Sequence, residues 1–306
     1  MNGALVITGP TASGKSQLTL ALARHFGAEI ISADSAQVYR GMDIGSAKPD
    51  TATLAEVKHH LIDIRDPADP YSAADFRKEC IALVSRIRGE GKLPIISGGT
   101  MLYLKALKEG LAELPAADPG IRAEILREAQ EHGWVHVHEE LQRVDHESSK
   151  RIRPTDPQRL QRAIEVFRLT GVPLSTLHRQ SVEACPFPLL EIAIIPDDRR
   201  VLHQAIEVRF REMLKAGFVE EVRLLREKPG IHSQLPAIKA VGYRQIWSFL
   251  EGEIDEQAMI DAALAATRQL AKRQHTWLRG WKDLNQLALP NTQQALKIVT
   301  KSTILD

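Results

Sequence analysis

One eight-residue segment near the start of the chain constrains the fold more than any other feature. It matches the pattern G-x-x-x-x-G-K-[ST], follows an apolar run at residues 4–8, and precedes a helical pattern that begins near Gln17. Its glycines let the backbone curl so that several N–H groups point into one concavity, and the next helix adds positive potential there. The segment therefore predicts a phosphate-binding loop, without indicating the reaction. The loop residues are Gly9, Pro10, Thr11, Ala12, Ser13, Gly14, Lys15 and Ser16.

Two residues of this loop have more specific expected roles. Lys15 should supply a fixed cation to the phosphates. Ser16 should place its hydroxyl on a Mg²⁺ ion, because Mg²⁺ prefers small oxygen ligands and often binds through substrate phosphates. We therefore expect Mg²⁺ as the cofactor. An ordinary glycine-rich turn is the less favoured interpretation of the segment.

Short apolar runs alternate with helical patterns along the chain. The runs lie at residues 4–8, 29–33, 60–64, 93–97 and 190–195. This alternation predicts an α/β fold, with a P-loop NTPase-like core whose mainly parallel sheet is covered by helices. Ser72 and Asp75 form a capping box before a predicted helix at 76–88. Ligands of such sheets lie beyond the carboxyl ends of the strands, which directs attention to the polar residues that follow them.

A long stretch between the fourth and fifth runs has no strand pattern. It contains helix starts at Asp118-Pro119 and Asp156-Pro157, each a capping residue followed by proline. We expect a core domain at 1–113 and 189–306 and a helical insertion domain at 114–188. The chain reads as mostly helical from about residue 198 to 281, which predicts a helical C-terminal region. Residues 284–306 predict nothing.

The 306-residue chain carries a net charge of only +1, so a nucleic-acid partner requires local basic surfaces. Two such clusters occur, and cations among aromatic or amide side chains suit contact with unpaired RNA. Each cluster alone is also explained by a solvated basic face. The first comprises Arg268, Lys272, Arg273, Arg279 and Lys282 with His275, Trp277 and Trp281. The second comprises Lys150, Arg151, Arg153, Arg159 and Arg162 with Gln158 and Gln161.

The length of the apolar runs and the spacing of the cysteines indicate the cellular compartment of the protein. No run of about 18 apolar residues occurs, and the chain begins directly with the first strand, so we expect a soluble, cytoplasmic protein without membrane contact. Cys80 and Cys185 lack metal-binding or disulfide spacing and are expected to be buried thiols. His59-His60 has no third ligand at suitable spacing, so no transition metal is expected.

Three polar positions near the predicted sheet edge admit two interpretations each, and a fourth candidate, Arg209, lies on a predicted helix. Asp34 suits a general base or hydrogen-bond acceptor, and equally a turn cap. Thr100, after Gly98-Gly99, suits a ligand contact or a helix N-cap. Asp63 has the position of a Walker-B acid, although a solvated strand end is the better interpretation. Arg209 lies among charged residues, and the local sequence alone places it on a solvated face.

Several segments taken together resemble the bacterial tRNA dimethylallyltransferases, also called IPP transferases. The most specific is 34–49, DSAQVYRGMDIGSAKP, and the likeness runs from about residue 4 to residue 281. Ala36 and Ser46 depart mildly from the family, in which Met and Thr are common at these positions. The other segments are the loop at 9–16, 59–63 (HHLID), 98–103 (GGTMLY), 242–244 (GYR) and 272–279 (KRQHTWLR).

The resemblance implies transfer of a dimethylallyl group from dimethylallyl diphosphate to the exocyclic amine of an adenosine. That adenosine lies 3′-adjacent to the anticodon in tRNAs that read codons beginning with U. The phosphate-binding loop then holds a departing diphosphate, with Mg²⁺ on Ser16. The implied catalytic residues are Asp34, which accepts a proton or hydrogen bond from the amine, Thr100, which orients it, and Arg209, which clamps the diphosphate. The family expectation is a monomer.

The resemblance also implies a set of tRNA contacts, which include members of both basic clusters. The main alternative is a P-loop small-molecule kinase, which should carry a lid with arginines aimed at ATP and has little need of a basic, Trp-bearing helix. The implied tRNA contacts are Asp34, Ser35, Ala36, Gln37, Thr100, Arg122, Gln158, Arg159, Leu160, Gln161, Arg162, Lys239, Ala240, Val241, Gly242, Tyr243, Arg244, Lys272, Arg273, Gln274, His275, Thr276, Trp277, Leu278 and Arg279.

Overall fold

The computed structural model describes residues 2–179 and 183–305. The chain divides into two compact units, which we describe separately: a core unit, Met1–Lys108 with Cys185–Asp306, and an insertion unit, Glu109–Ala184. The sequence suggested an insertion at 114–188, of which 180–182 lie outside the described residues. Helix α4 (Met101–Glu109) ends at the first boundary.

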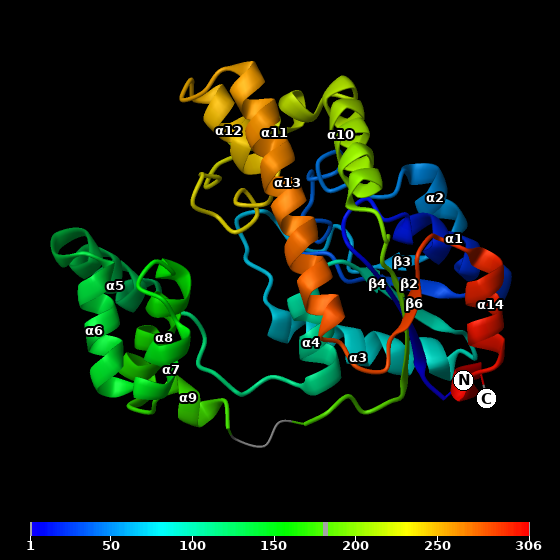
Figure 1. Cartoon of the computed structure of the whole chain (residues 1–306), viewed down its shortest axis with the longest axis horizontal. Coiled ribbons are helices and arrows are strands. Elements are labelled where there is room, and N and C mark those ends of the chain that lie inside the picture. Colours follow the sequence, from blue (N-terminus) through cyan, green and yellow to red (C-terminus); the bar gives the residue numbers. More distant parts are fainter. Residues whose placement is uncertain (1, 180–182, 306) are drawn as a thin grey trace. The chain divides into compact units, whose positions relative to one another are not determined.

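The core unit is built on a six-stranded sheet in the order β3-β2-β4-β1-β5-β6, and every neighbouring pair is parallel. This confirms the expected α/β class with a parallel sheet (Figure 1). Thr8, at the end of β1, lies opposite Gly98 of β4 and Ala193 of β5. The strands are β1 (Ala4–Thr8), β2 (Glu29–Ser32), β3 (His59–His60), β4 (Pro94–Gly98), β5 (Leu189–Ile194) and β6 (Asn285–Leu287).

The sheet differs from the sequence prediction at its two edges. The third strand was predicted at 60–64 but ends at His60, because Leu61 (φ 61°) and Asp63 (φ 56°) adopt left-handed conformations that an extended strand does not allow. At the other edge, β6 lies in the region from which the sequence predicted nothing. Three residues are too short to show a strand pattern.

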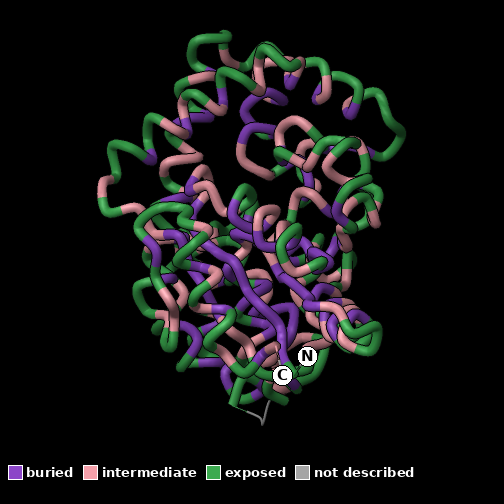
Figure 2. The backbone as a smooth tube through the Cα atoms, turned by 90° about the vertical axis from the view of Figure 1, so that its right-hand side faces the viewer, coloured by how far each residue is buried: buried purple, intermediate pink, exposed green. Residues whose placement is uncertain are grey.

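Alternate residues of the strands face two different layers of helices. Leu5 and Ile7 pack in one cluster with residues of α1 and α14, whereas Val6 packs in a second cluster with residues of α3, α4 and the later helices. Figure 2 shows the buried strands running through the centre of the core unit. The remaining core-unit helices are α1 (Lys15–Phe26), α2 (Thr51–Glu56), α3 (Ala73–Gly89), α10 (Arg199–Lys215), α11 (Phe218–Arg226), α12 (Tyr243–Leu250), α13 (Glu256–Arg279) and α14 (Thr292–Thr300).

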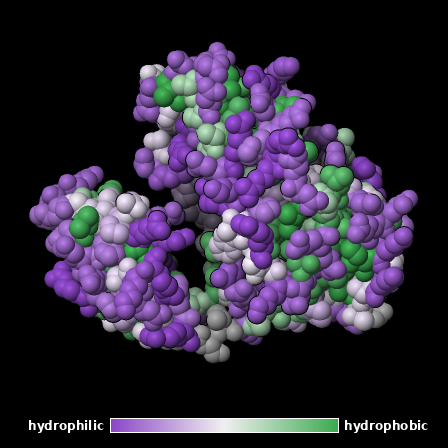
Figure 3. All heavy atoms as spheres, in the orientation of Figure 1, coloured by the Kyte–Doolittle hydropathy of each residue, from purple (hydrophilic) through white to green (hydrophobic). Residues whose placement is uncertain are grey.

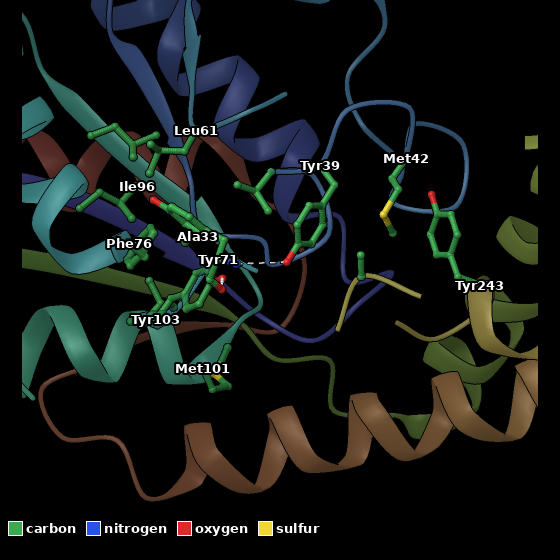
Figure 4. Packing of buried hydrophobic residues seen from close by; sticks show 14 of the residues in the cluster. Ala33, Tyr39, Met42, Leu61, Tyr71, Phe76, Ile96, Met101, Tyr103 and Tyr243 are labelled. Atoms are coloured by element: carbon green, nitrogen blue, oxygen red, sulfur yellow. Dashed lines mark hydrogen bonds between the residues drawn. The ribbon is translucent and has the colours of Figure 1, made fainter. Parts of the chain in front are cut away.

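Aromatic packing fixes the layer that contains α3 and α4. The rings of Phe76 and Tyr103 stack with centroids 4.6 Å apart, and Tyr71 meets Tyr103 edge-on (Figure 4). The backbone N–H of Tyr71 donates to the Tyr39 hydroxyl at 3.3 Å, which ties the loop after β2 to this layer. The capping box of Ser72 and α3 is present as predicted.

Helices are the only regular elements in the described part of the insertion unit, as the sequence suggested. Asp118 and Asp156 cap α5 and α8 through backbone N–H groups, at 2.9 Å and 3.2 Å, and proline follows each of them. Its own core includes Ile125, Leu141 and Ile164. Hydrophilic side chains cover most of the face seen in Figure 3. The helices are α5 (Pro119–His132), α6 (Trp134–Val144), α7 (His146–Arg151), α8 (Pro157–Thr170) and α9 (Leu174–Leu177).

Both cysteines are free thiols, as predicted; Cys80 is fully buried as expected, whereas Cys185 is only half-buried. Burial raises the pKa of the Cys80 thiol well above its ordinary value, which keeps it neutral and unreactive. Among the described helices, none has the length and apolar character needed to cross a membrane.

Candidate active site

A cavity of about 630 Å³ opens beyond the carboxyl ends of the central strands, where a parallel sheet places its ligands. Its lining comes from the core unit alone: the loop before α1, the segments after β2 and β4, and parts of α10, α13 and 239–243. The charged residues of the lining include Lys15, Asp34 and Arg209, and its apolar side chains include Phe210 and Met213.

The loop from Gly9 to Ser16 has the conformation that its sequence predicts. Gly14, with φ 85°, precedes α1, and a Cβ on Gly9 would lie 2.6 Å from the carbonyl oxygen of Ile194. Both positions therefore require glycine. The Ser13 hydroxyl is buried and has no hydrogen-bond partner in the described part of the chain. An unpaired buried hydroxyl in a loop of this pattern fits a site that is completed by a phosphate ligand.

Electrostatics tie Lys15 to the other charged groups of the cavity. Burial lowers the pKa of Lys15 to about 8, the Asp34 carboxylate opposes this shift, and the Arg209 guanidinium adds to it. Burial likewise lowers the pKa of Arg209, and Asp34 again raises it. Two cations and one carboxylate therefore act on one another here. A ligand with more than one negative charge would balance them.

Arg209 corrects one interpretation of the sequence. The local sequence placed it on a solvated face, but it lies half-buried on α10 and lines the cavity. Its neighbours Glu207 and Arg211 form the exposed pair, with Nη2 3.0 Å from Oε1. The family resemblance suggested that Arg209 contacts the ligand, whereas the local charge pattern did not.

The structure supports both interpretations of Asp34, and it places Thr100 in the cavity lining with its hydroxyl bonded to Ser35. Asp34 Oδ1 accepts a hydrogen bond from the Ala36 N–H at 2.9 Å, which is a turn cap, and the residue also lines the cavity. Thr100 precedes α4 and accepts a hydrogen bond from the Ser35 N–H at 3.0 Å. A Cβ on Gly98 would lie 2.1 Å from the Ala33 carbonyl oxygen, so only glycine allows the ends of β2 and β4 to approach this closely. That approach brings Asp34 and Thr100 into one wall.

Asp63 is exposed shortly after the end of β3, as a solvated strand end should be, but its carboxylate is paired. Its carboxylate forms an ion pair with Lys48, whose side chain is almost fully buried and also pairs with the Asp43 carboxylate. Lys48 also donates to the Tyr39 carbonyl oxygen at 3.0 Å. The acid therefore holds the 34–49 segment in place, and this contact takes up the carboxylate that a Walker-B role would need. No local sequence pattern indicated this pair, whose residues are 15 positions apart.

Glu221 of α11 holds the same segment from the other side. Its carboxylate accepts hydrogen bonds from the backbone N–H groups of Asp43, Ile44 and Gly45 at 2.9, 2.6 and 3.1 Å. The Tyr243 hydroxyl donates to it at 2.6 Å. Because Gly45 and Tyr243 line the cavity, this cluster shapes one of its walls. No sequence pattern singled out Glu221.

Gln274 is a second residue whose role the sequence did not reveal. It was predicted as a tRNA contact, yet its side chain is buried on the inner face of α13. Its Oε1 accepts from the Thr11 N–H at 2.9 Å, and its Nε2 donates to the Gly99 carbonyl oxygen at 2.8 Å. The residue therefore joins α13 to the phosphate-binding loop and to the end of β4.

The other core-unit residues implied as tRNA contacts fall into three groups. Lys272, Arg273, Thr276, Trp277 and Arg279 have exposed side chains on α13, as Arg244 has on α12, whereas Leu278 is fully buried and His275 is half-buried. A further group lines the cavity: Ser35, Ala36, Gln37, Lys239, Ala240, Val241, Gly242 and Tyr243, together with Arg273 and Trp277.

In the insertion unit, the implied contacts lie around a buried acid. Arg122 Nε and Arg162 Nη1 donate to the Glu165 carboxylate at 2.8 and 2.7 Å. Gln161 donates to the Arg122 carbonyl oxygen at 3.0 Å. Gln158 and Arg159 are exposed at the start of α8, and Leu160 is fully buried. Burial alone would raise the pKa of Glu165, but the two arginines hold it below its ordinary value.

The cavity lining contains a hydroxyl oxygen that suits Mg²⁺. The described residues contain no group of three or more His, Cys, Asp or Glu that could hold a metal ion. Ser16, the last residue of the loop, is exposed in the cavity lining, where its hydroxyl fits a magnesium ion that is bound mainly through phosphate oxygens.

The first strand of the parallel sheet enters a glycine-rich loop, and Lys15 and Arg209 face one cavity. These features define an α/β protein of the P-loop class that binds a phosphorylated ligand. The IPP transferase family model matches residues 37–281. The chain belongs to the IPP transferase family, as the resemblance indicated.

Solved structures agree with this assignment. The chain is similar to a full-length tRNA isopentenylpyrophosphate transferase from Bacillus halodurans, with 31% identity, 98% of this chain and 94% of that chain covered, and a TM-score of 0.70. For a tRNA delta(2)-isopentenylpyrophosphate transferase from Staphylococcus epidermidis, the identity is 32%, the coverage 98% of each chain and the TM-score 0.69. A eukaryotic dimethylallyltransferase acting on tRNA matches with 26% identity, 98% of this chain and 79% of that chain covered, and a TM-score of 0.79.

Proposed function

We propose that this chain transfers a dimethylallyl group from dimethylallyl diphosphate to the exocyclic amine of the adenosine 3′-adjacent to the anticodon, in tRNAs that read codons beginning with U. The observation that carries this proposal is the meeting of Lys15, Arg209 and Asp34 in one cavity. Two cations suit a diphosphate, and the apolar lining suits an isoprenoid chain. Membership of the IPP transferase family favours prenyl transfer over the kinase alternative.

The residues have separate roles in this reaction. The allylic C–O bond of the donor breaks, the adenosine nitrogen forms the new C–N bond, and diphosphate leaves. Lys15, Arg209 and the N–H groups of the loop stabilise the charge that develops on the diphosphate. Asp34 accepts the proton or a hydrogen bond from the amine, which Thr100 orients. Magnesium, held by Ser16 and phosphate oxygens, would supply further neutralisation of the leaving group.

The nucleophile is a base inside an anticodon loop, so it must leave the base stack to reach the cavity. We infer that the exposed cations of α13 and residues 239–244 bind the RNA around this base. Arg159 and its neighbours in the insertion unit provide a second basic surface for the same RNA. We also propose that the chain acts on tRNA in the cytoplasm and that it does so as a monomer.

Incubation of the full chain with labelled dimethylallyl diphosphate, Mg²⁺ and unmodified tRNA tests the proposal. Nucleoside analysis should find N6-dimethylallyladenosine at the position next to the anticodon, and free diphosphate in equal amount. A protein that transfers the γ-phosphate of ATP and leaves dimethylallyl diphosphate intact would be the kinase instead. A tRNA in which guanosine replaces that adenosine is the matched negative substrate.

A further inference from the structure

A buried glutamate lies near the point where the chain leaves and re-enters the core unit. Glu191 of β5 is 4% exposed, and its register with Val6 turns its side chain toward the helix layer that contains α4. Lys108, in the last turn of α4, is the last core-unit residue before the insertion, and Cys185 is the first one after it. The Cys185 N–H donates to the Lys108 carbonyl oxygen at 3.4 Å. These two residues form the root of the insertion unit.

The carboxylate of Glu191 connects this root to the end of α13. One oxygen accepts a hydrogen bond from Lys108 Nζ in an ion pair, and the other accepts from the Trp281 indole N–H at 3.0 Å. Lys108 Nζ also donates to the Lys282 carbonyl oxygen at 3.1 Å and lies 5.4 Å from the centre of the Trp281 ring. Trp281 follows α13 by two residues, and Figure 1 shows this end of α13 beside α4. The carboxylate therefore fixes the root to the end of α13.

A second buried glutamate of the same sheet has a different set of partners. Glu29 of β2 is 2% exposed and forms hydrogen bonds with Lys92 Nζ at 2.6 Å and with His60 Nε2 at 2.7 Å. His60 belongs to β3, and Lys92 lies just before β4; both strands are neighbours of β2. A buried carboxylate needs partners wherever it lies, because its charge is otherwise costly. Glu29 meets this need within the sheet, whereas Glu191 meets it by joining the root to α13.

We propose that Glu191 is a positioning residue for tRNA, which limits the freedom of the insertion root relative to α13. The inference rests on the proposed function, in which α13 and the insertion unit each carry a basic surface that contacts the same RNA. RNA that binds both surfaces must remove any freedom that remains at the root, and this ordering weakens binding. The diphosphate site should not respond, because Glu191, Lys108 and Trp281 lie outside the described lining of the cavity.

Equilibrium binding to the full chain tests this role, with unmodified tRNA measured by fluorescence anisotropy and pyrophosphate with Mg²⁺ measured by calorimetry. Glu191→Gln keeps the size of the side chain but removes the charge that holds Lys108. It should weaken tRNA binding by about tenfold and leave pyrophosphate affinity unchanged. Glu29→Gln is the matched control, because it removes an equally buried carboxylate that also pairs with a lysine. It should lower the melting temperature by a similar amount and keep the wild-type tRNA affinity.

Glu191→Asp covers the case in which the glutamine variant does not fold. It keeps the charge, but its shorter side chain cannot reach both Lys108 and Trp281, so tRNA binding should weaken by about threefold. Trp281→Phe removes the indole N–H and keeps a ring beside Lys108. Combined with whichever Glu191 variant folds, it should have no further effect. An equal loss of tRNA affinity with and without the Glu191 substitution overturns the proposal, because Trp281 would then act on the RNA by itself.

Two other results would also overturn this role of Glu191. One is an unchanged tRNA affinity in a folded Glu191 variant. The other is an equal loss of tRNA affinity in Glu29→Gln, which would make the effect a general consequence of lower stability. A wild type that binds tRNA but transfers no dimethylallyl group to it contradicts the proposed function alone, and the binding data still support or overturn the role of Glu191.

Discussion

Each unit of this protein contains a pair of cations, and the two pairs are held in opposite ways. In the core unit, Lys15 and Arg209 face a cavity, and in the described part of the chain neither has a carboxylate within ion-pair distance. In the insertion unit, Arg122 and Arg162 share the fully buried carboxylate of Glu165. Both pairs belong to the sets that the family resemblance singled out.

The difference indicates what each cation pair is for. Two partly buried cations without a partner destabilise a fold, so they persist only if a ligand neutralises them. Two arginines around one buried acid are already neutralised in part, and this arrangement fixes their orientation. We therefore expect substitutions in the core unit to change ligand binding or turnover, and substitutions at Glu165 to change stability first.

The largest expected effect concerns Asp34, the carboxylate that acts on both core cations. Asp34→Ala should lower kcat by about a thousandfold, because a proton acceptor is lost from the transition state. Pyrophosphate affinity should stay the same or rise, since removal of the acid leaves the cations more positive. Steady-state kinetics with calorimetry would show this split. Asp261→Ala, at an exposed position on α13, is the control. Full turnover in Asp34→Ala would remove it from the catalytic residues.

The second effect concerns Lys15 itself. Lys15→Ala should weaken pyrophosphate binding by about a hundredfold, because a charge-assisted contact is lost. Its thermal stability should be unchanged or higher, since a cation without a carboxylate partner is removed. Lys272→Ala removes an exposed lysine and should keep pyrophosphate affinity. A marked loss of stability in Lys15→Ala would mean that the comparison between the two units is wrong.

The third effect should appear in the other unit. Glu165→Gln leaves the guanidinium groups of Arg122 and Arg162 without their carboxylate, which should cost about 2 kcal/mol of local stability. Hydrogen exchange across α5 and α8 should accelerate, while pyrophosphate affinity is unchanged. Glu124→Gln, at an exposed position on α5, provides the control. Unchanged exchange in Glu165→Gln would show that the buried acid does not hold this unit together.

This network also changes how a tRNA test should be designed. Arg162 is tied to Glu165, so its reversal to an acid would disturb folding as well as RNA binding. Arg159 is exposed, and its ion pair with Asp156 spans 3.5 Å at the surface. Reversal at Arg159 alone therefore separates tRNA affinity from structure more cleanly than reversal at both positions.

Local patterns in the sequence predicted the parts of the fold that depend on neighbours in the chain. The loop at 9–16, the capping box at Ser72 and the proline-marked starts of α5 and α8 all follow from a few adjacent residues. Contacts between distant segments could not be predicted in this way. Gln274 meets Thr11 across 263 positions, and Glu221 meets Asp43 across 178. The local sequence around Arg209 is as charged as that of an exposed helix face. Its burial depends on the distant segments that pack against α10, which the local sequence does not reveal.

The smallest effect is a pH dependence, which tests whether Lys15 is as poorly neutralised as the geometry suggests. Its pKa is lowered from 10.5 to about 8, first by burial. The protonated form binds diphosphate, so pyrophosphate affinity should be constant below pH 8 and fall as the pH rises above it. The unfolded chain binds more protons than the folded chain between pH 8 and 10.5, so the stability of the ligand-free protein should rise over the same range.

These opposite trends distinguish Lys15 from other groups. Arg209 stays protonated throughout this pH range. A surface lysine would change neither the pyrophosphate affinity nor the stability until the pH approached its ordinary pKa near 10.5. Calorimetric titration with pyrophosphate and thermal melts of the ligand-free protein, each from pH 7 to 10, provide the two curves. Lys15→Ala should flatten both. Affinity that stays constant to pH 10 in the wild type would show that Lys15 is neutralised inside the protein, and that the core cations resemble those of the insertion unit after all.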